Sequence, residues 1–284
     1  MSAASGGGPV VAVLGLGEAG GAIARDLAAA GATVRGYDPA VPAEPPLVAA
    51  TGEADAARGA DLVLSVNSAH DAMDALIAGA EGVGEGVVWA DLNTGSPGLK
   101  AGLAAAARER GVRFADVAIM APVPGKGLRV PMLTSGEGAA DVAALLNRLG
   151  GRVEVLDGEP GLAASRKLLR SVFFKGLAAA VVEALEAARA AGCEEWLRQD
   201  IIGELSAAGP ATVDRLVTGS HRHAVRRTAE MDAAAKMLTE LGVPPLVATA
   251  SRDLLARLSA QARAETTAGT QAGAKAEQEA KSEA

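Results

Sequence analysis

The chain has 284 residues, of which 49% are hydrophobic and 21% charged, a composition typical of a globular protein with a sizeable core. Its net charge of −7 argues against general binding to nucleic acid or to anionic membranes. One cysteine excludes an internal disulfide, and three histidines without metal-ligand spacing argue against a metal enzyme.

The N-terminus has no basic start followed by an apolar core, so we expect no secretion signal. The sequence also contains no uncharged apolar run of about 18 residues, the length that a membrane span requires. We therefore expect a cytoplasmic protein whose residues 1–9 are flexible. Because aromatic residues make up only 2% of the chain, alanine, leucine and valine must fill its core.

The stretch from Val10 to Asp38 predicts a strand, a glycine turn, a helix and a second strand. An apolar run at residues 10–14 is followed directly by GLGEAG at residues 15–20. In a dinucleotide-binding turn, the first glycine makes the tight turn, the second admits a pyrophosphate and the third packs the helix closely. The pyrophosphate lies at the helix N-terminus, where the dipole favours negative charge. The alternative is a strand-turn-helix without a ligand, since 35 glycines produce chance spacings.

Asp38 indicates which dinucleotide is bound. It ends the second predicted strand, about 20 residues after the glycines, where an acid accepts hydrogen bonds from the ribose hydroxyls. The same charge repels a 2′-phosphate, so NAD is favoured over NADP. Two alternatives remain open: a turn-capping role for Asp38 before Pro39, and an NADP site that uses the nearby Arg35.

Strand-like and helical stretches alternate downstream. We expect strands at residues 61–66, 86–90, 112–118, 129–134 and 152–156, and helices at 70–80, 97–110 and 138–149. This alternation predicts a mostly parallel sheet covered by helices on both faces, with ligands bound at the carboxyl ends of its strands. Residues 66–68, 91–94 and 120–122 would then surround one crevice. The predicted cofactor-binding residues are Gly15, Leu16, Gly17, Glu18, Ala19, Gly20, Asp38, Val66 and Asn67.

After Gly161 the sequence becomes helical, with helices expected at residues 162–191, 194–207, 211–218, 222–241 and 245–264. At about 100° per residue, Lys167, Arg170, Ser171 and Lys175 share one sector of the first helix, and apolar residues occupy the rest. A polar stripe on an otherwise buried helix faces something wet or charged, and its three cations suggest an anionic ligand. The alternative is a solvated face.

These patterns predict an α/β protein with an N-terminal Rossmann-type, doubly wound parallel sheet followed by an all-α C-terminal domain. We expect the nucleotide-binding domain at residues 10–160 and the helical domain at residues 161–264. Residues 265–284 lack hydrophobic periodicity, so we expect a disordered tail.

Three motifs, GLGEAG at residues 15–20, DLNTGSP at residues 91–97 and GLAASRKLLRS at residues 161–171, resemble those of the β-hydroxyacid dehydrogenases. This group contains the 3-hydroxyisobutyrate and 6-phosphogluconate dehydrogenases. GLGEAG is similar to the family's GLGxMG. DLNTGSP at residues 91–97 is similar to its D-x-S-T-x-x-P substrate loop, with Asn93 where a serine is usual. GLAASRKLLRS at residues 161–171 is similar to its GxxxxxKxxxN helix. Residues 161–231 further resemble a bacterial, 6-phosphogluconate dehydrogenase-like branch with its own helical C-terminal domain.

The resemblance implies an oxidoreductase that transfers a hydride between NAD(P) and a small anionic hydroxy acid or its carbonyl counterpart. It puts the family's catalytic lysine at Lys167 and its substrate-binding asparagine at Ser171. In this chemistry a general base accepts the hydroxyl proton while the hydride leaves, and the lysine would be that base. The substrate-binding residues that we predict are Asn93, Thr94, Met120, Ser171 and Lys175.

The sequence departs from the family at Met120-Ala121-Pro122, where a serine-glycine-glycine loop is usual. This stretch is more similar to imine reductases, so an imine reductase stays an alternative. A dinucleotide-binding sensor without catalysis is a further alternative. Relatives form dimers through their helical domains, which implies a homodimer here. Arg226 and Arg227 would either form ion pairs with Glu230 along one helix or reach into a partner's crevice.

Overall fold

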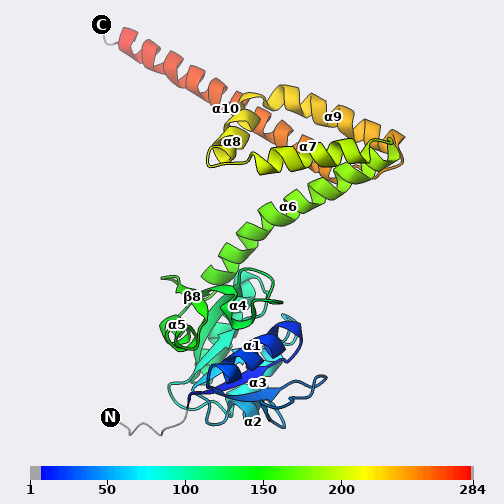
Figure 1. Cartoon of the computed structure of the whole chain (residues 1–284). Helices are drawn as coiled ribbons and strands as arrows, with labels where there is room; N and C mark the ends of the chain where they lie inside the picture. Colours follow the sequence, from blue (N-terminus) through cyan, green and yellow to red (C-terminus); the bar gives the residue numbers. More distant parts are fainter. Residues whose placement is uncertain (1–7, 283–284) are drawn as a thin grey trace. The chain divides into compact units, whose positions relative to one another are not determined.

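The computed structural model describes residues 8–282, and the side chains of residues 8–265. The chain forms two compact units, of which the first ends at Ser171 and the second begins at Val172. The first unit contains the sheet and the second consists of helices (Figure 1). The division lies inside a long helix, later than the boundary after residue 160 that the sequence indicated. Most of the N-terminus that we expected to be flexible lies outside the described residues.

The first unit is built on an eight-stranded sheet with the strand order β3-β2-β1-β4-β5-β6-β7-β8. Neighbouring strands are parallel except β6 and β7, so β7 and β8 run opposite to the others. The mostly parallel sheet is thereby confirmed. The strands are β1 (Val10–Leu14), β2 (Thr33–Tyr37), β3 (Val48–Ala49), β4 (Leu62–Ser65), β5 (Val88–Asp91), β6 (Arg113–Ile119), β7 (Pro131–Ser135) and β8 (Arg152–Val155).

Helices cover both faces of this sheet, as predicted for a doubly wound fold. Successive side chains of β1 alternate between the faces: Val11 and Val13 pack with α1 and α5, whereas Ala12 and Leu14 pack with α2, α3 and α4. Most of the buried side chains are alanine, leucine and valine, as the composition indicated. The helices are α1 (Glu18–Ala29), α2 (Glu53–Ala57), α3 (Ala72–Ala80), α4 (Pro97–Glu109), α5 (Ala139–Arg148) and the 3-10 turn η1 (Gly127–Arg129).

The helical part contains α6 (Leu162–Ala190), α7 (Glu194–Ser206), α8 (Thr212–Arg222), α9 (Ala224–Glu240) and α10 (Leu246–Ser282). None of these helices, within residues 8–282, is long and apolar enough to cross a membrane. The disorder expected from residue 265 onward was wrong for the backbone, because α10 continues to Ser282. Alanine, glutamate, lysine and glutamine favour a helix by intrinsic propensity even where no apolar stripe is present.

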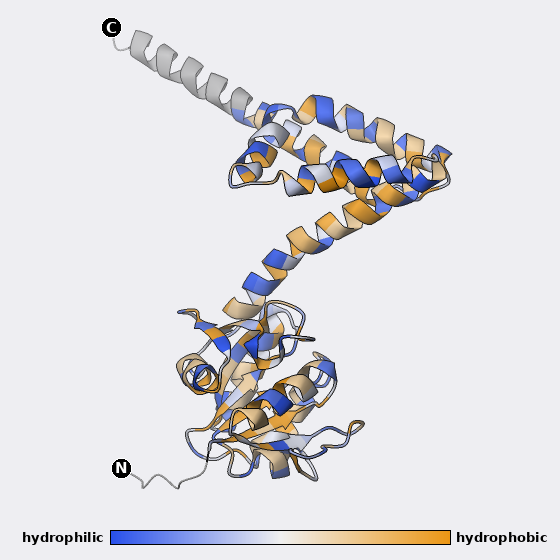
Figure 2. Ribbon diagram, viewed as in Figure 1, coloured by the Kyte–Doolittle hydropathy of each residue, from blue (hydrophilic) through white to orange (hydrophobic). Residues whose placement is uncertain are grey.

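A second correction concerns the apolar side of α6, which we expected to be buried. Val172 is 76% exposed and Phe173 is 57% exposed, and Figure 2 shows apolar residues along much of this helix. Helices α7 and α8 bury no residue at all among those described. The buried cluster of the second unit consists of Ala187, Ala235, Leu238 and Ala248. Apolar side chains of α6 that we expected to be buried are therefore exposed.

Candidate functional site

The three motif glycines occupy positions with different steric requirements. Gly15 has a φ of +95°, and a Cβ there would lie 2.6 Å from the carbonyl oxygen of Val66. A Cβ on Gly20 would lie only 1.9 Å from the carbonyl oxygen of Gly15, so this residue sets the close approach of α1 to β1. A Cβ on Gly17 would meet no atom within 4 Å. Gly15 and Gly20 are thus required by the fold, whereas Gly17 borders open space.

The N-terminus of α1 fits the diphosphate of a dinucleotide. Gly17 is the N-cap residue and no side chain caps the helix there. The first N–H groups of a helix have no partner inside it, and anions bind them with help from the helix dipole. The open space beside Gly17 and the uncapped N–H groups therefore match the nucleotide site that the glycine motif predicts.

Asp38 lies directly after β2, at the predicted place, and fixes the turn. Its carboxylate accepts hydrogen bonds from the backbone N–H groups of Leu16 at 2.8 Å, Ala40 at 2.8 Å and Val41 at 2.9 Å. Partial burial raises the pKa of Asp38, but these three hydrogen bonds outweigh it and leave the pKa below its usual value. Asp38 is therefore an anion held at the edge of the glycine turn.

Arg35, the residue that would bind the 2′-phosphate in the alternative NADP site, has its guanidinium bonded to other groups. Its guanidinium pairs with the Asp55 carboxylate at 3.1 Å and donates to the carbonyl oxygen of Ala56 at 3.2 Å. Both acceptors belong to α2, on the face of the sheet covered by that helix. Of the two residues, Asp38 is therefore the one that contacts the glycine turn.

The start of α6 is bonded to the loops that follow two neighbouring strands. Lys167 Nζ donates to Thr94 Oγ1 at 2.8 Å, and Arg170 Nη1 donates to the carbonyl oxygen of Met120 at 2.8 Å. Thr94 follows β5 and Met120 follows β6, so both lie at the carboxyl edge of the sheet. Lys167, Thr94 and Met120, predicted from separate motifs, are brought together within the first unit.

Asn93 lies beside Thr94 but points inward. It is 6% exposed, and its Nδ2 donates to Asn67 Oδ1 at 2.7 Å, to Asp91 Oδ2 at 2.7 Å and to Ser65 Oγ at 3.1 Å. These bonds join the loops after β4 and β5, as the predicted crevice requires. A ligand could reach only the Oδ1 of this amide.

The two remaining predicted substrate residues lie further along α6. Ser171 follows Lys167 by four residues, on the same side of the helix, and is partly exposed. Lys175 is exposed and belongs to the second unit. In that unit, Arg226 pairs with Glu230 at 3.4 Å and Arg227 Nη1 lies 3.1 Å from Ser220 Oγ. The Arg226 contact is the ion pair that the first interpretation of the arginine cluster expects, whereas Arg227 donates to a hydroxyl group instead.

A buried ion cluster lies behind these loops, and sequence reasoning missed it. Lys100, on α4, is 1% exposed; its Nζ donates to the carbonyl oxygen of Asp91 at 2.8 Å and to Asp91 Oδ1. The same ammonium lies 3.1 Å from Asp116 Oδ1, at an angle that makes an ion pair without a hydrogen bond. Burial raises the pKa of Asp91, while Lys100 opposes that effect.

Residues of the sheet cap the first turn of α6. Asp116 Oδ2 accepts hydrogen bonds from Gly161 N at 3.0 Å and Ala164 N at 2.9 Å. Ser135 Oγ accepts a further one from Ala163 N at 3.1 Å. The helix that carries Lys167 is thereby fixed to β6 and β7 at its origin. One signal was available: Asp116 is the only charged residue within the apolar run FADVAI at residues 114–119.

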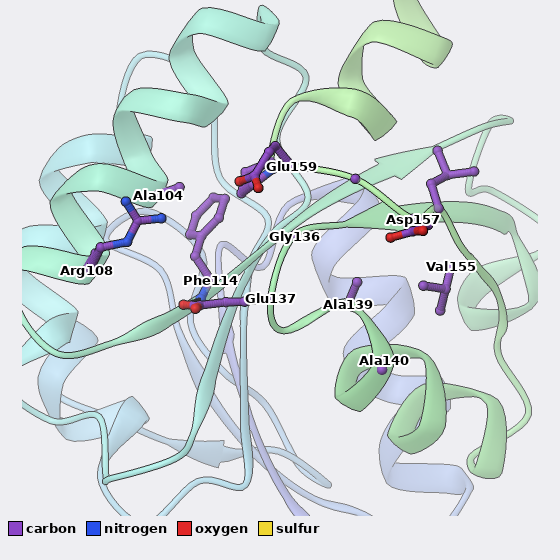
Figure 3. A pocket seen from close by; sticks show the side chains of 13 residues that line it. Ala104, Arg108, Phe114, Gly136, Glu137, Ala139, Ala140, Val155, Asp157 and Glu159 are labelled. Atoms are coloured by element: carbon purple, nitrogen blue, oxygen red, sulfur yellow. Dashed lines mark hydrogen bonds between the residues drawn. The ribbon is translucent and has the colours of Figure 1, made fainter.

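A separate pocket of about 460 Å³ lies at the opposite edge of the sheet, where β6 begins and where β7 and β8 end. Figure 3 shows Phe114, Arg108, Glu137 and Glu159 among the side chains that line it. None of the residues predicted to bind cofactor or substrate lines this pocket. The glycine turn and the contact between Lys167 and Thr94 lie at the carboxyl edge instead.

Comparison with known proteins supports a nucleotide-binding fold. Residues 10–150 match the family described as the NAD binding domain of 6-phosphogluconate dehydrogenase, and residues 188–258 match a domain of unknown function, DUF1932. A conserved hypothetical protein from Sinorhizobium meliloti 1021 is 30% identical over 87% of each chain, with a TM-score of 0.58. Another conserved protein, described as structurally similar to 3-hydroxyacid dehydrogenases, is 27% identical over 89% of this chain and 98% of its own, with a TM-score of 0.58.

Imine reductases share the fold at lower identity. A variant from Myxococcus stipitatus in complex with NAD+ is 21% identical over 89% of this chain and 94% of its own, with a TM-score of 0.72. An imine reductase from the same organism has been solved with NADP+ and has a TM-score of 0.73 at 19% identity, over 89% of this chain and 95% of its own. With its NAD-binding domain of the 6-phosphogluconate dehydrogenase type and its DUF1932 domain, the chain belongs to the NAD(P)-binding dehydrogenase and reductase family.

Proposed function

We propose that the protein is an NAD-dependent oxidoreductase that transfers a hydride between nicotinamide and a small anionic hydroxy acid or its carbonyl counterpart. Lys167 is its general acid/base. The observation that carries the proposal is the 2.8 Å hydrogen bond from Lys167 Nζ to Thr94 Oγ1. It holds an amine at the same edge of the sheet as the glycine turn, where ligands of such sheets bind.

Proton transfer is the part of the reaction that this chain must supply. A nicotinamide held by the glycine turn would supply the hydride acceptor for oxidation of the alcohol carbon and the hydride donor for reduction of the carbonyl carbon. During oxidation the neutral amine of Lys167 accepts the hydroxyl proton, and during reduction its ammonium donates a proton to the carbonyl oxygen. The Thr94 hydroxyl orients this amine. Such a positioned acid/base contributes about 10²- to 10⁴-fold to the rate.

The residues predicted from the sequence supply the proposed substrate contacts. Thr94 and Ser171 hydrogen-bond the substrate, the Met120 loop forms one wall, and Lys175 pairs with the substrate's carboxylate or phosphate. Asn93 acts mainly from behind Thr94, because its amide donors are already bonded to Asp91 and Asn67. The preference for NAD rests on the anion of Asp38 and on the engagement of Arg35 with Asp55.

A second candidate, an imine reductase, is supported by the Met120-Ala121-Pro122 loop and by the shared fold with imine reductases. Reducing an imine also consumes a hydride and a proton, so Lys167 could serve there too. A sensor that binds NAD without turnover is the third candidate. The three differ in what they consume, which makes them separable by one assay.

We further propose that the protein is a homodimer formed through its helical unit. A helix of a globular protein buries one face, yet α7 and α8 bury no residue within the described chain. A second copy carries the same apolar faces, and a twofold interface brings identical surfaces together.

The deciding experiment measures NADH and NAD consumption by the full chain against hydroxy acids, aldehyde acids and cyclic imines. We expect turnover with the acids, and Lys167→Ala should reduce kcat by at least about 10²-fold without changing NADH affinity. Lys236 is an exposed lysine of α9, so Lys236→Ala is the matched control. Turnover of imines alone would select the reductase, and retained turnover in the Lys167 variant would remove this lysine from the mechanism.

A further inference from the structure

Lys100 carries a buried charge on the apolar face of a helix. On α4 it shares the buried side with Leu103, Ala104 and Ala107, and 1% of its side chain is exposed. Burying ions requires their desolvation, and apolar residues of similar volume at such positions are often as stable or more so. Stability alone therefore does not account for a lysine at this position. The groups that are bonded to its ion cluster indicate what else the lysine does.

The cluster contains two carboxylates for one ammonium, and each carboxylate holds a different part of the site with its second oxygen. Asp91 Oδ2 accepts from Asn93 Nδ2 at 2.7 Å. Asp116 Oδ2 accepts from Gly161 N and Ala164 N, where the positive end of the α6 dipole also favours an anion. Asp91 and Asp116 are neighbours in the register of β5 and β6, and Lys100 bridges them.

We infer that Lys100 is a positioning residue, which holds the substrate loop and the start of α6 in fixed relation through Asp91 and Asp116. It thereby sets the contact between Thr94 and Lys167. The inference rests on the proposed function of Lys167. Asn93 directly precedes Thr94, and Ala164 lies one turn before Lys167, so each side of the contact has its own anchor to the cluster. A misplacement of about 1 Å in such a pair reduces turnover by about 10²-fold.

The test compares Lys100→Met with the matched control Lys236→Met in the full chain. For Lys100→Met we expect kcat to fall by about tenfold or more, the pH profile of kcat to shift, and NADH affinity to stay unchanged. Amide hydrogen exchange should become faster at residues 161–167 and at residues 93–96 together, and stay unchanged in α1. Lys236→Met should change none of these quantities.

A merely structural lysine would give a different result. In that case the melting temperature would fall, while kcat and its pH profile, measured well below that temperature, would stay at wild-type values. That result, or faster exchange confined to α4, would overturn the inference. Hydrogen exchange needs no substrate, so it still reports on the coupling if the wild-type protein proves to have no turnover, which would instead overturn the proposed function.

A second variant keeps the test decisive if Lys100→Met does not fold. The double variant Lys100→Met/Asp116→Asn removes one positive and one negative charge. The side-chain amide oxygen introduced at position 116 can still accept hydrogen bonds from the N–H groups of α6. We expect this variant to show the same fall in kcat of about tenfold or more and the same faster exchange at residues 93–96, because Asp91 has lost its ammonium. Wild-type kcat and wild-type exchange at residues 93–96 in the folded double variant would overturn the inference.

Discussion

Asp38 joins the loop after β2 to the glycine turn, because its carboxylate accepts N–H groups from both. Of its two oxygens, Oδ2 bonds to Leu16 and Oδ1 bonds to Ala40 and Val41. A bidentate carboxylate offers about four acceptor directions, so a ribose hydroxyl can still be accepted beside these three bonds. The turn-capping role that the sequence left open and the proposed ribose contact are therefore compatible.

This dual role gives a prediction for Asp38→Asn. The amide keeps one acceptor oxygen for the turn but removes the charge that repels a 2′-phosphate. We expect the ratio of NADPH to NADH dissociation constants to fall by about tenfold, the equivalent of 1.4 kcal/mol. Fluorescence titration of both nucleotides measures this ratio. An unchanged ratio would show that the charge of Asp38 does not select the cofactor.

At the residue scale, motif spacing singled out residues that lie together, but not the ion cluster behind them. Lys167 and Thr94 were predicted from separate motifs, and they form a hydrogen bond. Lys100 and Asp116 were missed, because a charged residue inside an apolar stretch is visible in the sequence, but the partner that it meets on another element is not. The inward orientation of Asn93 was equally hidden, since its partners come from two other strands.

At the scale of one element, the turn between β1 and α1 provides a matched pair of variants. Gly20→Ala forces a methyl group against the Gly15 carbonyl, and overpacking of this kind costs about 1–3 kcal/mol or more. Gly17→Ala meets nothing but projects toward the proposed diphosphate. We expect the first variant to lower Tm by about 5 °C and the second to leave Tm within about 2 °C while weakening NADH binding about tenfold. Equal effects on both quantities would contradict these distinct roles.

The junction of α6 and α7 predicts a response to acid. Glu194 accepts hydrogen bonds from Arg189 and Arg198, and these bonds lower its pKa to about 2. A carboxyl with a lowered folded pKa stabilises the fold above its unfolded pKa of about 4.3, and this contribution is lost as the pH falls toward 2. The difference in Tm between wild type and Glu194→Gln should thus shrink between pH 5 and about pH 2. A constant difference in thermal melts would refute this.

Whole elements were more predictable than their ends. Strand and helix runs of the sheet unit follow one another with clear periodicity, and the structure confirms them. The short pair β3 and α2 escaped detection because two and five residues give too little pattern to recognise. The helical tail after residue 264 was missed for the opposite reason, since propensity without an apolar stripe resembles disorder.

At the scale of the whole molecule, the exposed apolar surface of the helical unit leads to a prediction about assembly. We expect the full chain to have twice the monomer mass of 28.2 kDa in solution. Val172→Asp, on an exposed part of α6, should shift it toward the monomer, while Glu109→Lys on the exposed end of α4 should not. Light scattering after size exclusion checks both. A monomeric wild-type chain would exclude the proposed dimer.

The reversal of direction between β6 and β7 determines how far the Lys167 side chain must extend to reach the edge of the sheet where ligands bind. Strand β8 ends at the opposite edge, and α6 starts beside Asp116, three residues or about 10 Å before the end of β6. The three residues from Ala164 to Lys167 add about 4.5 Å of helix, and the long lysine side chain covers the rest. Inserting one residue in this interval would rotate the amine by about 100° without touching the glycine turn, and so separate nucleotide affinity from proton transfer in one protein.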